Sequence, residues 1–251
     1  MHIEELIPPH VLPVRVLCLR CPVDHFELEQ VILASIDEVS TFAVEKRRNE
    51  HLSGRWLLAQ ALERWGLDPS QLEIRRTELR APVLAHLPGL WLNTPLPSIS
   101  IGHSGGWAYV AVIETEWSVG IDAEPADRGI AKNAFDMMAR GDELIWLRQN
   151  PTRAIELWTS KESIQKAMQM GMHLNPRQIQ IPIGVGVKNI SIGNTKIQLQ
   201  NWEFNEARVS LAWHNKPVHL RTPEDDLLDA TRIAMQEQEW SIGCKTTSQG
   251  A

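Results

Sequence analysis

The chain has 251 residues and a formal net charge of −6, from 25 lysines and arginines against 31 aspartates and glutamates. Charged residues make up 22% and hydrophobic residues 43%, which excludes a disordered or membrane-embedded chain, and the acidic balance disfavours a protein that binds nucleic acid mainly through phosphate contacts. The length allows one large domain or two of ordinary size. Residues 1–5 are acidic, unlike the start of a signal peptide, so we expect a cytoplasmic protein with no membrane association.

The first half is predicted to contain one long helix and several strands. Residues 14–19 predict a short buried strand. Cys18, within it, and Cys21, just after it, are expected to be reduced thiols. Apolar residues recur at three- and four-residue steps between 40 and 66, a helical pattern that Gly66 ends. Residues 76–98 are rich in proline and glycine and predict a loop with short extended pieces. Three strands follow, at 99–103, 107–114 and 117–124.

The second half is predicted to repeat this order. Residues 129–148 and 152–170 have helical periodicity, and strand patterns occupy 178–183, 195–204 and 207–214. A last helix is expected at 225–240, and a polar tail at 245–251. Each half would thus run helices first and a small antiparallel sheet second. The sequence therefore predicts an α+β fold of two similar halves, residues 1–124 and 125–251, related by a pseudo-twofold duplication.

Two acidic residues share one face of the strand at 117–124. In Val119-Gly120-Ile121-Asp122-Ala123-Glu124, apolar positions alternate with Asp122 and Glu124. Because side chains alternate along a strand, both acids lie on the same face. Two carboxylates that converge repel one another unless a cation or a proton lies between them. A bound cation is the preferred interpretation.

A third carboxylate lies in the helix predicted at 152–170. Glu162 and Lys166, four residues apart, could be only a helical ion pair. Combined with Asp122 and Glu124, however, Glu162 completes a set of three carboxylates, a reasonable protein share of the six oxygen ligands of Mg²⁺. Lys161 or Lys166 could then offset charge on a phosphoryl oxygen.

Two further segments suit anion binding. His103 ends a predicted strand, and the turn Ser104-Gly105-Gly106 that follows permits close approach of backbone N–H groups to an anion. A turn histidine without a function explains His103 equally well. Arg48 and Arg55 lie with His51 on one helical face, and arginine suits phosphate oxygens, although on spacing alone a solvated surface is the better explanation.

In this order, the motifs resemble those of the 4′-phosphopantetheinyl transferase superfamily, in its large pseudodimeric (Sfp-type) branch, and most closely the siderophore-synthetase-associated members. The resemblance rests on four segments between residues 47 and 166. These are Gly120-Ile121-Asp122-Ala123-Glu124, Trp158-Thr159-Ser160-Lys161-Glu162-Ser163-Ile164-Gln165-Lys166, Gly102-His103-Ser104 and Ser53-Gly54-Arg55-Trp56-Leu57-Leu58.

The resemblance implies a secondary-metabolism enzyme that moves the phosphopantetheine arm of coenzyme A (CoA) onto a serine of an acyl or peptidyl carrier protein and releases adenosine 3′,5′-bisphosphate. CoA would bind in a cleft between the halves. Asp122, Glu124 and Glu162 would hold Mg²⁺, with Asp122, Glu162 and Lys166 as the catalytic group. The base that activates the carrier serine, either a carboxylate or a metal-bound hydroxide, stays open. The CoA contacts implied by the resemblance are Arg47, Arg48, Arg55, Arg80, His103, Ser104, Lys161 and Lys166.

Three positions depart from the family pattern. Gly102 replaces a serine, Arg80 is shifted relative to the usual basic residue before a proline, and the helix containing Glu143 is only loosely kept, so that the role of Glu143 is open. A non-catalytic homologue that binds CoA or a carrier protein is the alternative function. A Mg²⁺ phosphohydrolase is disfavoured because we find no second acidic pair. A duplicated chain already contains the interface that a half-length relative forms by dimerising, so we expect a monomer.

Overall fold

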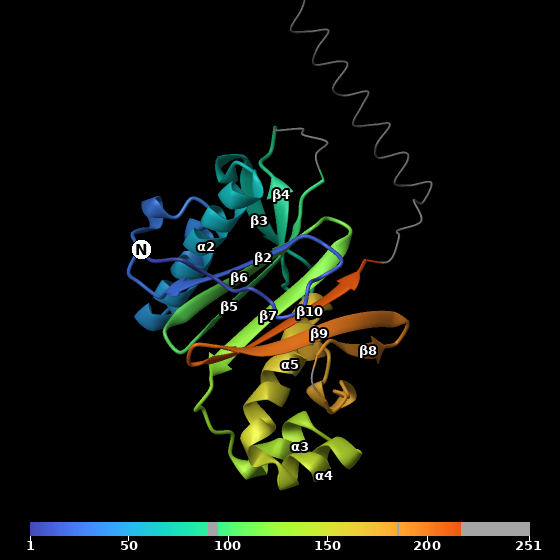
Figure 1. Ribbon diagram of the computed structural model, residues 1–251. Helices are drawn as coiled ribbons and strands as arrows, with labels where there is room; N and C mark the ends of the chain where they lie inside the picture. Colours follow the sequence, from blue (N-terminus) through green and yellow to red (C-terminus); the bar gives the residue numbers. More distant parts are fainter. Residues whose placement is uncertain (90–94, 185, 217–251) are drawn as a thin grey trace, which may run out of the picture. The chain divides into compact units, whose positions relative to one another are not determined.

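The first sheet of the protein is antiparallel and covered by one long helix. The computed structural model describes residues 1–89, 95–184 and 186–216. In this sheet, the strand order is β1-β2-β6-β5, formed by Glu4–Glu5, Val16–Pro22, Trp107–Ile113 and Ser98–Ser104 respectively. Figure 1 shows α2 (Glu45–Trp65) lying against the sheet, where its leucines pack with apolar residues of β2 and β6. The predicted strands around β2, β5 and β6 are therefore confirmed.

The helix predicted between residues 40 and 66 is confirmed as α2, although it begins at Glu45 rather than residue 40. Gly66 ends it in the left-handed region, with φ of 97°. Shorter helices, η1 (Leu28–Gln30) and α1 (Ile36–Val39), precede it. After η2 (Pro69–Gln71), β3 (Leu72–Arg76) and β4 (Pro82–His86) form a separate hairpin, so β4 is one of the short extended pieces predicted within 76–98, whereas β3 was not predicted.

The second sheet has the order β7-β10-β9-β8, all antiparallel. Its strands are β7 (Trp117–Pro125), β10 (Ala207–Asn215), β9 (Thr195–Phe204) and β8 (Lys188–Ile192). The first three confirm predicted strands. β7 pairs with β10, so this strand belongs to the second sheet and not, as expected, to the end of the first half. The strand predicted at 178–183 is wrong: residues Pro176–Gln178 form the 3₁₀ helix η6, and the fourth strand lies at β8.

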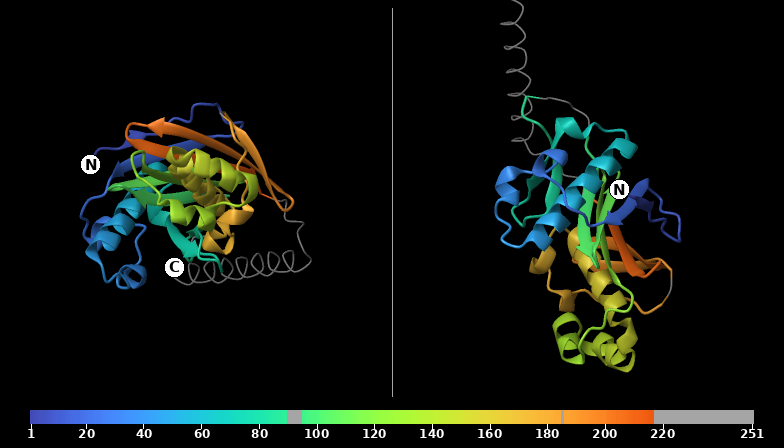
Figure 2. Two further views of the ribbon diagram at one scale, coloured as in Figure 1. Left: turned by 90° about the horizontal axis from the view of Figure 1, so that it is seen from below. Right: turned by 90° about the vertical axis from the view of Figure 1, so that its left-hand side faces the viewer.

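The helices of the second half differ from prediction at two points. The helix expected at 129–148 is divided into η3 (Lys132–Ala134), α3 (Phe135–Met138) and α4 (Gly141–Gln149), because Ala139 and Arg140 adopt extended backbone. Helix α5 (Ala154–Ala167) follows η4 (Pro151–Arg153) and is succeeded by Gln169, which has a left-handed φ of 56°. It therefore ends before residue 170, the predicted end of this helix, and Gly171 begins η5 (Gly171–His173). Figure 2 shows α3 and α4 at the opposite end from α2.

Both sheets have the same chain connectivity. A strand (β2 or β7) leads to a long helix (α2 or α5), and a hairpin (β5–β6 or β9–β10) then returns so that its second strand pairs with the first strand. Each half thus begins with a strand, which corrects the expected order of helices before sheet. The helix 225–240 and the tail 245–251 lie outside the described residues.

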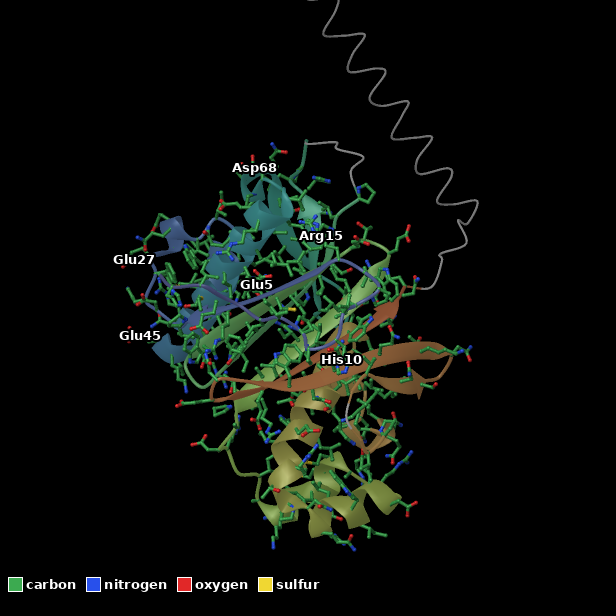
Figure 3. All side chains as sticks on the ribbon, viewed as in Figure 1. Glu5, His10, Arg15, Glu27, Glu45 and Asp68 are labelled. Carbon is green, nitrogen blue, oxygen red and sulfur yellow. The ribbon has the colours of Figure 1, made fainter. Side chains whose placement is uncertain are left out.

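Strands β5 and β7 bring the two sheets together. They form no backbone ladder with each other, but the Ser98 hydroxyl donates to the carbonyl of Trp117 at 2.6 Å, and the Ser100 hydroxyl accepts from the N–H of Ile121 at 3.0 Å. The N-terminal segment adds another link. Figure 3 shows His10 over the second sheet, where its backbone exchanges two hydrogen bonds with the Gln200 side chain.

Two further expectations concern the thiols and membrane spans. Cys18 and Cys21 are buried free thiols, and burial raises the pKa of each to about 12, which keeps them protonated and unreactive. Among the described residues, every helix is too short or too polar to cross a bilayer.

Candidate active site

Strand β7 presents Asp122 beside helix α5. Val119, Ile121 and Ala123 are buried in the core, as the alternation predicts. Asp122 is only 8% exposed, and its Oδ1 lies 2.7 Å from Nζ of Lys166, which extends from α5. The same ammonium donates to the carbonyl oxygen of Ile121 at 3.1 Å. The structure therefore brings together two of the three residues expected to form the catalytic group.

Two glycines make this contact possible. A Cβ on Gly120 would lie 1.9 Å from the carbonyl oxygen of Ser163, so α5 rests directly on the β7 backbone. A Cβ on Gly102 would lie 3.0 Å from Lys166 Nζ. The glycine that departs from the family pattern therefore leaves room for the Lys166 ammonium.

Glu124 and Glu162 lie close enough to Asp122 to influence its ionisation. Burial raises the pKa of Asp122 to about 6, opposed by Lys166 and reinforced by the negative charges of Glu162 and Glu124. Burial alone would lower the pKa of Lys166, but the carboxylates of Asp122 and Glu162 outweigh it and raise this pKa. A carboxylate set with such mutual repulsion suits a hard cation.

One oxygen of the Asp122 carboxylate has no partner in the structure described. Its Oδ2 is buried and has no hydrogen-bond partner among the described residues, and an unpaired buried carboxylate oxygen is unfavourable. A divalent cation would satisfy it, so the donor set fits Mg²⁺. In the present side-chain positions, however, no group of three or more histidine, cysteine, aspartate or glutamate residues within the described ranges is arranged to hold a metal. The metal assignment stays a prediction.

Glu124 is held at the same edge by two partners. The Ser104 hydroxyl, at the start of the Gly105-Gly106 turn, donates a short hydrogen bond to its carboxylate. Nη1 of Arg128 lies 2.5 Å from Oε1 of Glu124. Sequence reasoning placed Ser104 against phosphate and missed Arg128, which follows the turn after β7, where no strand or helix periodicity indicates the contact.

His103 and Arg47 meet at a buried glutamate that sequence reasoning missed. Glu50 lies in α2 and is 6% exposed; its Oε2 is 3.0 Å from Arg47 and 3.5 Å from Nδ1 of His103. Burial lowers the pKa of His103, Glu50 opposes this, and Lys166 and Arg47 reinforce it. Glu50 follows Arg47 by three residues, so the helical spacing could have indicated the pair.

Arg55 belongs to a second cluster around Glu38. Arg55 is 3% exposed and donates to Glu38 at 3.0 Å, and Arg76, which was not predicted, donates to the same carboxylate. Burial and the nearby Arg55 lower the pKa of His51 to about 4, so it is neutral. Nη1 of Arg55 is buried and has no hydrogen-bond partner among the described residues, which leaves a donor for an anion.

Arg48 and Arg80 lie apart from these clusters. Arg48 donates to the carbonyl of Phe26 at 3.2 Å, so it contacts the segment before η1. Arg80, with φ of 66°, lies in the turn between β3 and β4. It lines a pocket of about 600 Å³ together with Ser100 of β5 and Lys166 of α5. Arg80 and Lys166 therefore line one pocket, and their assignment to CoA stays a prediction.

The Lys161 side chain is enclosed in the protein interior. It is 0% exposed, and its ammonium donates to the Glu143 carboxylate at 2.5 Å and to the carbonyls of Met138, Pro176 and Ile179. All of these partners belong to the protein. The expected contact with phosphate or carrier is therefore corrected: Lys161 joins α5 to α3, α4 and η6. The role of Glu143, left open by the sequence, is to neutralise this buried lysine.

Two family models match the chain. The model of the 4′-phosphopantetheinyl transferase N-terminal domain matches residues 37–113, and that of the 4′-phosphopantetheinyl transferase superfamily matches residues 118–224. Together they cover most of the chain, and the second begins within β7, in agreement with the pairing of β7 in the second sheet. No individual curated protein matches it significantly.

Proposed function

Because the chain belongs to the 4′-phosphopantetheinyl transferase superfamily, we propose that it transfers the 4′-phosphopantetheine arm of CoA to a serine of an acyl or peptidyl carrier protein, with Mg²⁺, and releases adenosine 3′,5′-bisphosphate. The observation that carries this proposal is the placement of Lys166 against buried Asp122, with Glu162 and Glu124 close enough to influence the same carboxylate. This group combines ligands for a cation with a cation for a phosphoryl oxygen.

In this proposal, Asp122, Glu124 and Glu162 would hold Mg²⁺, which when bound supplies positive charge to the diphosphate of CoA. Lys166 stabilises negative charge that develops on the leaving side of the diphosphate as the carrier serine attacks the β-phosphorus. The serine proton passes to a base; Glu162 is less free for this role if it is a metal ligand.

The basic residues would hold the rest of CoA. Arg55, with its unpaired Nη1, and Arg80, beside Lys166 at one pocket, are the best placed phosphate contacts. His103 and Arg47 lie together at Glu50, and would contact phosphate oxygens from there. Arg48, bound to the Phe26 carbonyl, is a weaker candidate.

The finer features of the assignment are part of the same proposal. The repeated connectivity of the two sheets supports a pseudo-twofold duplication, with CoA bound between the halves. We also propose a cytoplasmic monomer, most similar to the siderophore-associated branch of the family.

Mass spectrometry of an apo carrier protein tests the proposal. Incubation with CoA, Mg²⁺ and the protein should add about 340 Da, the mass of the transferred arm. The gain should vanish in Asp122→Ala, with EDTA, and with a carrier whose acceptor serine is alanine. Asp136→Ala, which removes an exposed carboxylate of α3, is the matched control and should retain activity.

Binding measurements distinguish the alternative function. If the protein binds CoA by calorimetry but modifies none of several unrelated carriers, it is a non-catalytic binding homologue. That result would overturn the transferase assignment while leaving the CoA contacts intact.

A further inference from the structure

Three cations surround one carboxylate in the second half, away from the candidate active site. Glu156, in the first part of α5, lies 2.7 Å from Nη2 of Arg153, 3.6 Å from Nζ of Lys188 and 3.4 Å from Nη1 of Arg208. These residues come from η4, β8 and β10, which converge here. We call Arg153, Lys188 and Arg208 the β8–β10 cationic cluster. Glu203, mostly exposed, pairs with Arg208 at 2.6 Å, so three positive charges face two negative ones.

The cluster leaves several buried donors unused. Nε of Arg153, Nε of Arg208 and Nε1 of Trp202 are inaccessible to solvent and have no hydrogen-bond partner among the described residues. Glu156 occupies only the outer nitrogens of the two guanidinium groups. A buried N–H without an acceptor is unfavourable because it has lost its hydrogen bond to water without gaining another. Three such donors in one place indicate that an acceptor is missing.

The residues of these donors line a common cavity. A pocket of about 560 Å³ is lined by Arg153, Trp202, Arg208, Lys188 and Glu156 among others. A second pocket, of about 590 Å³, shares Arg153, Glu156 and Lys188 with it.

The second pocket is more apolar. Trp146, Leu157 and Ile181 contribute to its wall. Space for a polar head group therefore adjoins space for an apolar body.

We propose that the β8–β10 cationic cluster binds a phosphate-type oxyanion, either free or as the head group of a small organic monoester. A tetrahedral oxyanion offers acceptors in several directions, which suits donors that converge from η4, β8, β9 and β10. The cluster has no residue in common with the pocket of Arg80 and Lys166. The proposal therefore does not depend on the transferase function.

The charges of the cluster support an anion. Lys188 is 9% exposed, and burial lowers its pKa, with Glu156 opposing and Arg153 adding to the decrease. A bound anion would compensate both the burial and the repulsion from Arg153.

Nuclear magnetic resonance of the full chain gives a local readout. The indole N–H signal of Trp202, assigned by its loss in Trp202→Phe, should shift and saturate on titration with inorganic phosphate. Lys188→Gln and Arg208→Gln should weaken binding at least tenfold. Lys196→Gln, which removes an exposed lysine from the same strand as Trp202, is the matched control and should leave affinity unchanged.

A variant that binds phosphate more tightly than wild type excludes misfolding as the cause of the weaker binding of the other variants. Glu156→Gln removes the negative charge that competes with the anion, so it should bind phosphate several-fold more tightly. Phenyl phosphate distinguishes the two sources: tighter binding than inorganic phosphate identifies an organic monoester, and equal binding identifies the free anion. An indole signal that does not move with either probe, or equal affinity in wild type, Lys188→Gln and Glu156→Gln, would overturn the proposal.

Discussion

Gly120→Ala tests how closely α5 rests on β7. The added Cβ would lie 1.9 Å from the carbonyl oxygen of Ser163 and 2.5 Å from the backbone nitrogen of Ala167. Both atoms belong to the helix backbone, so no side-chain rotation relieves the clash. Ordinary contacts begin near 3.4 Å, so the helix and strand must separate by about 1.5 Å.

This separation should affect both stability and activity. Overpacking usually costs about 1–3 kcal/mol, and we expect the upper end or more because backbone atoms are involved. The same movement carries Glu162 and Lys166 away from Asp122. A misplacement of about 1 Å can lower a catalytic rate about a hundredfold. The rate of the proposed phosphopantetheine transfer should therefore fall about a hundredfold.

Urea unfolding measures the stability term, with Gly129→Ala as the matched control. Gly129 is exposed, has no atom within 4 Å of an added Cβ, and lies outside the left-handed region. Its variant should equal wild type or gain up to about 1 kcal/mol through a less flexible unfolded chain. If Gly120→Ala unfolds within about 0.5 kcal/mol of wild type, the close packing inferred for the two elements is wrong.

Three other predictions concern titratable side chains that are buried or partly buried. Lys161→Met should lower the free energy of unfolding by about 3–5 kcal/mol, because Glu143 is left buried without its partner; a loss below 1 kcal/mol in urea unfolding would contradict this. In EDTA, Asp122→Asn should gain stability relative to wild type as pH rises from 4 to 7, since the raised pKa of Asp122 makes ionisation costly in the folded state; a difference independent of pH refutes that cause. His51 has its pKa lowered to about 4, so the unfolded chain binds the extra proton as pH falls from 6.5 to 4. His51→Gln should therefore lose less stability than wild type over that interval and match its pH dependence above pH 7; parallel curves throughout would show that His51 does not contribute.

Local patterns predicted the elements whose signals are contained in a few residues. Alternation along β7 identified the strand and placed Asp122 and Glu124 on one face, and Gly66 marked the end of α2. The pattern at 178–183 failed because a short apolar run does not distinguish a strand from a loop that packs on a core, and Ile179 and Ile181 pack there without pairing. The break between α3 and α4 at Ala139 was not predicted, because the segments on both sides of it have helical periodicity.

Residue roles were predicted less well than elements. Lys161 precedes Glu162 directly, so it points to another face of α5, and whether that face meets solvent or α3, α4 and η6 depends on distant segments. Glu50 is buried and Glu38 is half-buried, each beside arginine and histidine side chains that no local sequence pattern assigns to it. Burial and partner choice arise from packing between segments, which spacing along the chain does not contain.

The sequence by itself indicated the family through its motifs. It also predicted the carboxylates of β7 and the lysine of α5, because strand and helix periodicities orient neighbouring residues directly. The tertiary structure alone decided that β7 belongs to the second sheet, that Lys166 reaches Asp122 past Gly102, and that Lys161 is an internal ion pair. It also brought Arg153, Lys188 and Arg208 to one carboxylate from three elements. Such convergence depends on strand pairing and helix packing over long separations, for which a single sequence carries no local signal.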